Sequence, residues 1–547
     1  MTNYFKAFLY LFFLLYATTL LAHGFQEADT LLGKNGPYRA WWDAQHYALK
    51  LTVDVEGKGI YGTNDITFMA IDAGHKMQID LQEPMKAEAF IFNGEELPFE
   101  RIAPAYFVTL PTTLSAGESY TLQVKFRGKP KIAKKAPWDG GFVWSEDKSG
   151  NLFMATACQG EGASSWWPCK DYPADEVKGM DIYVSVPKGY MDVSNGRLIS
   201  RKKDQGVWTY HWQVKNPINN YGVNLNVAKY VHFAEQYQGE KGELDLNYYV
   251  LPENLEKAKK QFQEVPRMLA AFEHWFGPYP FYEDGFKLVE VPYLGMEHQS
   301  SVTYGNQYAN GYLGRDLSGS GWGLKFDFII VHEAGHEWFA NNITNSDIAD
   351  MWIHEGFTTY SEALFVDYYW GKEACNEYMR GIRKRVLNDQ NVIGEYGMNQ
   401  MGSGDMYVKG ALLVHNLRLW VNDDTVFRNM LREMNNKYYH QTISSAQLEA
   451  FISNYLNLNL SGFFDQYLRS TMIPTLEYEV RGKVLFYRWI NVVEHFQMPV
   501  ELHINGEQKR LFPAANWQKL PLNNPSVPIA HDSDFYCGFQ FNGQFPH

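Results

Sequence analysis

The feature that most limits what this chain can fold into is the segment from Val331 to Phe357, VHEAGHEWFANNITNSDIADMWIHEGF, in which two histidines stand four residues apart. On a helix, His332 and His336 would lie on one face, one turn apart. The apolar FDFIIV before them indicates that this helix is buried. Eighteen residues separate His336 from Glu355, enough for the helix to end, a loop to turn and a second helix to return. The fold is therefore expected to hold two neighbouring helices in its interior.

Two histidines and one glutamate with an open fourth position form a catalytic rather than a structural zinc site. His332, His336 and Glu355 are therefore predicted to bind one zinc ion (Zn2+) per chain. Glu333 stands one residue from a ligand, where it can take a proton from a water activated by the metal and pass it to a leaving amine. Glu362, seven residues after Glu355 and so on the same helical face, can support a ligand. The alternative is a pair of histidines that are buried in the core with their hydrogen bonds satisfied. It does not explain a glutamate between them in so apolar a helix.

The period of the apolar residues divides the chain. From about residue 40 to 235 they alternate with polar ones, as in YALKLTVDVEG and SYTLQVKFRG. This period of two, interrupted by Gly, Pro and Asp turns, predicts an antiparallel β domain with one solvated face. After Pro252, apolar residues spaced three and four apart from Leu255 to Phe272 predict one amphipathic helix. Helical patterns continue to about 470, and alternation returns after Pro474.

At 547 residues and 45% apolar content, the chain is long enough for several hydrophobic cores. We therefore predict a multidomain α+β protein, with an N-terminal antiparallel β domain, a mainly helical zinc domain and a small C-terminal β domain. The predicted ranges are 1–24 for a signal peptide, 25–236 for the N-terminal β domain, 237–470 for the zinc domain and 471–547 for the C-terminal β domain.

The first 24 residues have the pattern of a secretory signal peptide. Lys6 precedes an uncharged, mostly apolar run from Ala7 to Ala22 that ends in small residues. The run is shorter than the roughly 20 residues that a membrane span usually needs. We therefore expect a secreted or periplasmic protein whose mature form has no membrane span. The alternative is a protein anchored by an uncleaved signal segment.

Charge and cysteine content exclude other classes of protein. The formal net charge is −13, from 49 Lys and Arg against 62 Asp and Glu, so nucleic acid and anionic membrane surfaces are disfavoured as partners. The four cysteines form no CxxC pair, which argues against a disulfide scaffold or a cysteine-type zinc site. Cys158 and Cys169 either pair in an oxidising compartment or remain buried free thiols.

The motif HEAGHEWF followed by WIHEGF resembles the aminopeptidase N family of gluzincin metallopeptidases. The pattern of that family is HExxH, 18 residues, and then a ligand glutamate within a WLNEGF-like segment. The resemblance implies a thermolysin-like zinc domain after a β domain, and a small C-terminal β-sandwich such as some members carry. It also implies peptide substrates with a free N-terminus.

Three further segments resemble the same family. The segment YLGMEHQ is similar to the family's GAMEN signature, with Gly295, Met296 and Glu297 at substrate-binding positions and His298 in place of the Asn. By this resemblance, Glu297 binds the free α-amine of the substrate. CQGEGASSWWPCKDYP is similar to the segment that ends in PCFDEP, which makes Gln159 the second amine anchor, with its near neighbour Glu161 as the alternative. In MYVKGALLV, Tyr407 resembles the catalytic tyrosine that donates to the oxyanion.

Two rival functions remain on the sequence alone. One is an endopeptidase, or a hydrolase of another substrate, on the same zinc site; the presence of Glu297 with Gln159 argues against it. The other is a catalytically silent binding protein that keeps the fold. Intact Glu333, Tyr407 and zinc ligands argue against this second rival, since a decayed site usually loses one of them.

Overall fold

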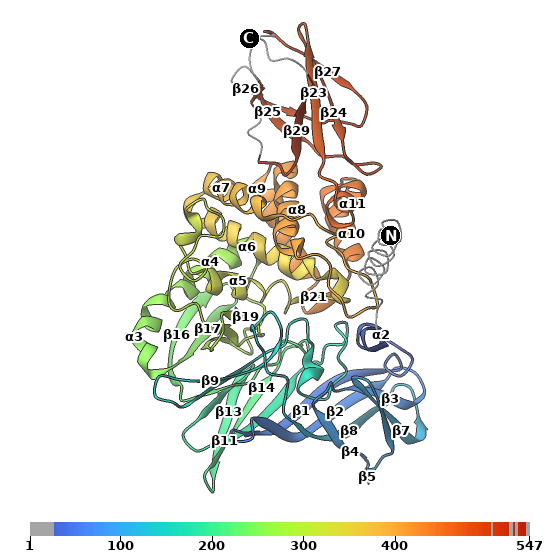
Figure 1. The fold of residues 1–547 in the computed structure, drawn as a ribbon, viewed down its shortest axis with the longest axis vertical. Helices are drawn as coiled ribbons and strands as arrows, with labels where there is room; N and C mark the ends of the chain where they lie inside the picture. Colours follow the sequence, from blue (N-terminus) through green and yellow to red (C-terminus); the bar gives the residue numbers. More distant parts are fainter. Residues whose placement is uncertain (1–26, 505–506, 525–528, 531–533, 543–547) are drawn as a thin grey trace, which may run out of the picture.

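The computed structural model describes residues 27–504, 507–524, 529–530 and 534–542, so the predicted signal peptide, 1–24, lies outside the described residues. Three regions follow one another along the long axis of the molecule (Figure 1). A β-rich region comes first, a mainly helical region forms the middle, and two small sheets lie at the other end. The predicted multidomain α+β fold is thereby confirmed.

The N-terminal region consists almost entirely of strands. They are β1 (Trp42–Asp54), β2 (Gly59–Ala70), β3 (Gly74–Asp80), β4 (Lys86–Phe92), β5 (Glu95–Glu96), β6 (Phe99–Ile102), β7 (Ala105–Leu114), β8 (Ser119–Gly128), β9 (Gly141–Glu146), β10 (Leu152–Ala157), β11 (Met180–Pro187), β12 (Met191–Val193), β13 (Arg197–Asp204), β14 (Val207–Val214) and β15 (Asn226–Ala228). They form an eight-stranded sheet of order β13-β14-β11-β1-β2-β8-β4-β5, a four-stranded sheet β12-β15-β10-β9 and a three-stranded sheet β3-β7-β6.

The predicted alternation in this region corresponds to the burial of its side chains. Leu49, Leu51 and Val53 of β1 are buried, whereas Lys50 between them is exposed. The sheet is not antiparallel throughout, because β1 pairs with β11 in parallel, with Leu49 opposite Ile182. A parallel pair needs a long crossover connection, and the strands between β1 and β11 provide it.

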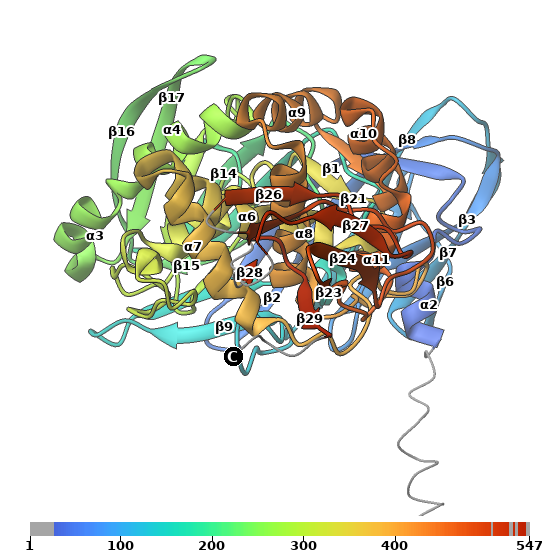
Figure 2. The same ribbon diagram turned by 90° about the horizontal axis from the view of Figure 1, so that it is seen from above.

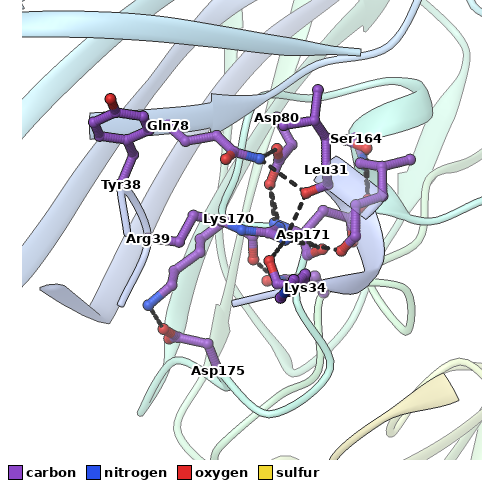
Figure 3. A network of polar contacts seen from close by, with 12 residues as sticks. Leu31, Lys34, Tyr38, Arg39, Gln78, Asp80, Ser164, Lys170, Asp171 and Asp175 are labelled. Atoms are coloured by element: carbon purple, nitrogen blue, oxygen red, sulfur yellow. Dashed lines mark hydrogen bonds and ion pairs between the residues drawn. The ribbon is translucent and has the colours of Figure 1, made fainter. Parts of the chain in front are cut away.

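A short helix, α2 (Glu27–Gly33), is fastened to the β region by the fully buried Arg39 (Figure 3). The Arg39 guanidinium donates to the carbonyl oxygens of Leu31 and Leu32 at 2.7 and 2.9 Å, and to Asp80 at 2.9 Å. Asp80 also accepts a hydrogen bond from the backbone N–H of Asp171 at 2.9 Å. The two terminal nitrogens of this buried guanidinium thus donate to a carboxylate and to carbonyl oxygens, which offsets the cost of burying the charge. This network joins α2 to the segment that follows Gln159.

The middle region combines a five-stranded sheet and a two-stranded sheet, β21-β22, with most of the helices. Its strands are β16 (Val231–Gly239), β17 (Gly242–Val250), β18 (Phe286–Glu290), β19 (Gly295–Met296), β20 (Val302–Tyr304), β21 (Ile343–Asn345) and β22 (Gln441–Ile443). Its helices are α3 (Leu255–Gln261), α4 (Glu264–Phe276), α5 (Phe328–Gly335), α6 (Trp352–Trp370), α7 (Lys372–Ile382), α8 (Asp405–Val421), α9 (Asp424–Lys437), α10 (Ser445–Leu456) and α11 (Ser461–Leu468). The five-stranded sheet has the order β16-β17-β18-β20-β19.

The single amphipathic helix predicted from Leu255 to Phe272 is two helices, α3 and α4. The break lies just before Pro266, which therefore falls in the first turn of α4. Proline has no N–H to donate and is tolerated in a first turn, whereas inside a continuous helix it would remove a hydrogen bond and clash with the preceding turn. The apolar spacing thus predicts helical structure correctly, and Pro266 accounts for its division into two helices.

The C-terminal strands are β23 (Thr475–Arg481), β24 (Val484–Ile490), β25 (Val500–Ile504), β26 (Glu507–Leu511), β27 (Gln518–Pro521), β28 (Ile529–Ala530) and β29 (Gly538–Phe541). They form two sheets, β27-β24-β23-β29 and β26-β25-β28, which lie over α8 and α11 in Figure 2. Buried residues such as Leu476 and Trp489 belong to the same apolar cluster as the helices. The Arg510 guanidinium donates to the carbonyls of Leu419 and Trp420 in the last turn of α8. These contacts fix the sandwich to the helical region.

The remaining structural predictions have mixed outcomes. Cys158 and Cys169 are both buried free thiols, so the alternative of a disulfide between them is not borne out. Within the described ranges, no helix is both long and apolar enough to cross a membrane. The predicted boundary at 236/237 falls within β16, and the one at 470/471 falls between α11 and β23; the domain limits stay predictions.

Candidate metal and amine-binding site

The two histidines of the motif lie at the C-terminal end of α5. Asp327 caps the N-terminus of this helix and accepts hydrogen bonds from the N–H groups of Ile329 and Ile330. The helix ends at Gly335, so His336 is its C-cap residue, still in right-handed helical geometry with φ −65°. The imidazoles of His332 and His336 consequently share one face, with ring centroids 5.1 Å apart. The helix is shorter than the sequence pattern indicates, but the expected pairing of the two rings is unaffected.

Glu355 reaches the same place from the first turn of α6. Its Oε2 atom lies 3.8 Å from His332 Nε2 and 3.4 Å from His336 Nε2. The three ligand atoms all lie within 4.8 Å of one another, and all three residues are buried. The structure therefore brings together the three residues that the spacing predicted as ligands.

The outer nitrogen of each imidazole is already occupied. His332 Nδ1 lies 2.7 Å from Glu362 Oε1, and His336 Nδ1 lies 3.0 Å from the carbonyl oxygen of Phe339 and 3.0 Å from Thr358 Oγ1. A proton held on Nδ1 by these acceptors leaves the Nε2 lone pair of each ring free to bind a metal. Glu362 thus lies where it was predicted to support a ligand.

The donor set fits a zinc ion. Among the residues that the structure describes, the buried Glu355 Oε2 has no hydrogen-bond partner, which is costly for a carboxylate oxygen unless a cation neutralises it. Two imidazole nitrogens and one carboxylate oxygen within 4.8 Å of one another match the three protein ligands of a catalytic zinc site. His332, His336 and Glu355 are the residues that would hold it.

The electrostatics of the site also favour a cation. Burial tends to lower the pKa of His336, but the negative charges of Glu355 and Glu297 outweigh it and raise this pKa to about 10. Burial opposes ionisation of Glu355, yet the histidines lower its pKa to about 2. Burial raises the pKa of Glu333 to about 7, near the value that a group needs to act first as base and then as acid. The three carboxylates together attract one positive charge to the place where the ligands converge.

A second carboxylate cluster adjoins the first. Glu297, which is buried, has an oxygen within 4.8 Å of ligand-type atoms of Glu333 and His336. Gln159 Nε2 lies 2.7 Å from both Glu297 Oε1 and Glu355 Oε1, so its amide donates to the two carboxylates at once. The Tyr221 hydroxyl donates to Glu297 Oε1 at 3.2 Å. The structure thus places Gln159, rather than its neighbour Glu161, at the site; Glu161 pairs with Lys131 instead.

Gly295 and Met296 form β19, the edge strand of the five-stranded sheet. The Leu294 carbonyl accepts from Gly305 N at 2.7 Å and the Met296 carbonyl from Thr303 Oγ1 at 3.1 Å, so both face β20. Because peptide groups alternate along a strand, those of Gly295 turn to the open edge. A Cβ atom at Gly295 would lie 2.6 Å from Ile329 Cγ2 and 3.3 Å from Glu333 Cγ. Only glycine fits here, and its free peptide groups lie beside Glu333.

Tyr407, in the first turn of α8, also borders the metal ligands. Its ring lies 6.3 Å from that of His332, centroid to centroid, with 21° between the planes. Burial and the nearby carboxylates of Glu355 and Glu297 raise the pKa of Tyr407, so its hydroxyl stays protonated and can donate. His298 is fully buried, and burial lowers its pKa to about 3, so its ring is neutral.

Two residues that contact the site belong to no sequence motif and are not predicted from the sequence. Tyr221 contacts Glu297 from the β region, and Tyr378 of α7 donates a hydrogen bond to Glu362. The only signal near Tyr221 is the polar run NPINNYG, whose asparagines Asn219 and Asn220 are buried. A cluster of amides before a tyrosine is unusual for a core segment, but it does not indicate which carboxylate it faces.

Glu297, Gln159 and Tyr221 are called the amine cluster below, because Glu297 is the predicted amine ligand. Gln159 and Tyr221 also line a small cavity of about 60 Å³. Its walls include Leu32 of α2, and Ile348 and Met351 from the segment just before α6. The Arg39 network that holds α2 therefore shapes one wall of this cavity. Both of the regions that meet at the site contribute to it.

Comparisons with known proteins agree with this geometry. The model of the peptidase family M1 domain matches residues 261–467, and that of the peptidase M1 N-terminal domain matches residues 43–221. The chain is 21% identical over 441 residues to leucyl aminopeptidase of Saccharolobus solfataricus, covering 76% of this chain and 53% of the relative. It is 22% identical over 441 residues to leukotriene A-4 hydrolase of Xenopus laevis, covering 76% and 68%. It thus spans about half of the first relative and two thirds of the second.

A solved structure shares the fold. It is the crystal structure of a glutamate-to-alanine variant of an M1 zinc metallopeptidase from Deinococcus radiodurans, bound to a Tyr-Ser-Ala substrate. The two chains are 22% identical with a TM-score of 0.66, and the match covers 80% of this chain and 95% of that one. With two family models that span most of residues 43–467 and with a shared fold, the resemblance to the aminopeptidase N family is confirmed, and the chain belongs to peptidase family M1.

Proposed function

We propose that this protein is a zinc aminopeptidase that releases N-terminal residues from peptides, with one zinc ion per chain held by His332, His336 and Glu355. The observation that carries the proposal is the Gln159 amide, which lies 2.7 Å from both Glu297 and the metal ligand Glu355. This contact supports the proposal because Glu297, the proposed amine ligand, then lies next to a residue that would bind the metal. The names of the relatives, leucyl aminopeptidase among them, support the same activity.

The chain's own residues divide the chemistry among them. When bound, zinc polarises the scissile carbonyl and lowers the pKa of a water molecule. Glu333, with a pKa of about 7, takes a proton from that water and then gives it to the leaving amine. Tyr407 donates a hydrogen bond to the oxyanion that develops on the carbonyl oxygen. Glu333 and Tyr407 are thus the proposed catalytic residues.

The amine cluster selects the end of the peptide. A free α-ammonium forms charge-assisted hydrogen bonds with Glu297, which Gln159 and Tyr221 hold in place. The outward peptide groups of Gly295, and Met296 next to it, align the backbone of the substrate in extended form along the edge of the sheet. Because the amine is fixed beside Glu333, the bond after the first residue is the one that reaches the catalytic groups.

A pair of chromogenic substrates tests the proposal. An aminoacyl p-nitroanilide should be hydrolysed, and its N-acetylated form should be hydrolysed at least about 100-fold more slowly, since acetylation removes the charge that Glu297 binds. Chelation should abolish turnover, and zinc should restore it. Equal hydrolysis of both forms would indicate an endopeptidase or another hydrolase on the same centre. No turnover of either form by the zinc-loaded protein would indicate a silent homologue.

We also propose export, because residues 1–24 have the pattern of a signal peptide. The mature protein is then secreted or periplasmic, or anchored if the segment is not removed. N-terminal sequencing of the protein from the culture medium, the soluble periplasm and the membrane fraction distinguishes these outcomes. Full-length protein confined to the cytoplasm would contradict export.

A further inference from the structure

If the proposed function holds, the order of residues along β19 determines in which direction a bound peptide runs along this strand. Glu297 is the proposed amine ligand, and Glu333 lies beside Gly295, two residues earlier in the chain. A peptide that runs from the amine at Glu297 past Glu333 must therefore continue towards Leu294 and Tyr293. Each extended residue advances about 3.3 Å, so the residues after the cleaved bond pass out along this edge.

A groove of about 670 Å³ lies at that exit. Tyr293 and Leu294, the two residues that precede Gly295 in the chain, line it. Its outer walls include Trp138, whose side chain is 67% exposed, and Leu313, which is 40% exposed. A volume in this range accommodates several residues of an extended peptide, and exposed aromatic side chains are common anchors for such ligands.

Two lysines from different regions line this groove. Lys148 lies in the turn between β9 and β10 of the N-terminal region, and Lys257 lies on α3. Both are exposed, and no ion pair joins either of them to another described residue within 4.0 Å. Glu290 also lines the groove, but it is buried and accepts hydrogen bonds from the N–H of Leu251 at 2.7 Å and from Asn254 at 2.6 Å. In a chain of net charge −13, the lining of this groove thus carries two exposed ammonium groups that no carboxylate of the described residues pairs.

We propose that this groove binds the part of a peptide substrate that follows the cleaved bond, and that Lys148 and Lys257 select a carboxylate there. The carboxylate is either an acidic side chain or the C-terminus of a short peptide, which share the same chemistry. Trp138 contacts the apolar parts of the same segment. The proposal adds a preference for acidic oligopeptides to the proposed aminopeptidase activity.

The test uses pentapeptides with a common first and second residue. Residues three to five contain Asp, Asn or Lys, and each peptide is made as the free acid and as the C-terminal amide. We expect kcat/KM to fall about three- to tenfold from Asp to Asn and further to Lys, mostly through KM, in line with surface charge pairs. The free-acid and amide forms distinguish a C-terminal carboxylate from a side chain as the preferred group.

Charge reversal identifies the lysines. In the double variant Lys148→Glu/Lys257→Glu, the preference should change to the Lys peptides; in Lys483→Glu, an exposed lysine in the C-terminal sandwich, the preference should remain as in the parent protein. Trp138→Ala should raise KM for all the peptides alike. An aminoacyl p-nitroanilide, which has no residue of this kind after the bond, reports whether the catalytic centre of each variant is intact.

A binding measurement separates this proposal from the proposed function. Calorimetric titration of the same peptides into the Glu333→Gln variant measures affinity without turnover. If p-nitroanilides are hydrolysed but the Asp, Asn and Lys peptides do not differ in kcat/KM or affinity, the groove proposal is wrong and the function stands. If nothing is hydrolysed but affinity follows the charge, the function is wrong and the groove stands. Absence of both effects overturns both.

Discussion

The metal ligands and the amine cluster are neighbours in space but are assembled differently. His332, His336 and Glu355 come from α5 and α6, two helices of one region that are close in sequence. The amine cluster joins Glu297 of the middle region to Gln159 and Tyr221 of the β region. Metal binding would therefore depend on one region alone, whereas the proposed recognition of an N-terminus would depend on the interface between two regions. Mutations can test the two parts separately: the metal end, which consists of the three ligands and Glu362, and the amine end, which is the amine cluster.

The largest effect is expected for Glu333→Gln. It removes the proton acceptor but no metal ligand, so kcat should fall by about three orders of magnitude while zinc content by mass spectrometry stays at one per chain. Glu264→Gln is the matched control. Burial raises the pKa of Glu264 to about 7, as it does for Glu333, but Glu264 lies on α4 and does not belong to the site. A Glu333→Gln enzyme with kcat within tenfold of the parent protein would remove Glu333 from the mechanism.

The next effect is expected for Glu297→Gln, at the amine end. Loss of the charge should lower kcat/KM for free-amine substrates by up to about 100-fold, as expected for hydrogen bonds to charged groups. The rate ratio between an aminoacyl p-nitroanilide and its acetylated form measures the effect directly. Zinc affinity should change much less than this ratio. A large loss of zinc with an unchanged ratio would mean that Glu297 belongs to the metal end.

Glu362→Gln tests the metal end. Glu362 orients His332 through a 2.7 Å contact, so its replacement should weaken zinc binding by at least about tenfold. Competition with a chromophoric chelator measures the dissociation constant. At saturating zinc, KM and the preference for a free amine should remain close to those of the parent protein. Failure to weaken zinc binding would show that Thr358 and the backbone suffice to hold the ligands.

The smallest effect is expected for Tyr221→Phe. It deletes one hydroxyl that donates to Glu297 at 3.2 Å, so KM for free-amine substrates should rise about three- to tenfold with little change in kcat. The phenyl ring keeps the packing against His354, whose ring lies 6.4 Å away, centroid to centroid. An unchanged KM would indicate that Gln159 alone positions Glu297.

The sequence predicted the metal end well because its information is local. A spacing of four residues on a helix places His332 and His336 together, and the eighteen-residue gap allows one return of the chain to Glu355. The amine end depended on resemblance for Glu297 and Gln159. Tyr221 could not be found, because no periodicity relates it to a carboxylate 76 residues away.

The fold shows the same division between local and long-range information. Alternation predicted the strands, since burial on one face of β1 imposes it. It could not predict that β11 lies parallel to β1, because the order of strands depends on contacts between distant segments. The break between α3 and α4 was predictable from Pro266, whose missing N–H disfavours a continuous helix. The groove with Lys148 and Lys257 needed the structure, because its walls come from two regions.

The forked contact of Gln159 has a consequence for the motions of the molecule. Its side-chain amide donates both to Glu355, which would bind zinc, and to Glu297, which would bind an amine. Gln159 lies in the β region, whereas both carboxylates lie in the middle region. Any opening between the two regions must therefore stretch a contact to the metal ligand. Since binding free energies are reciprocal, an ion that prefers the closed arrangement also stabilises that arrangement. Bound zinc would then help to hold the β region against the middle region, and its removal would let the two regions separate more readily.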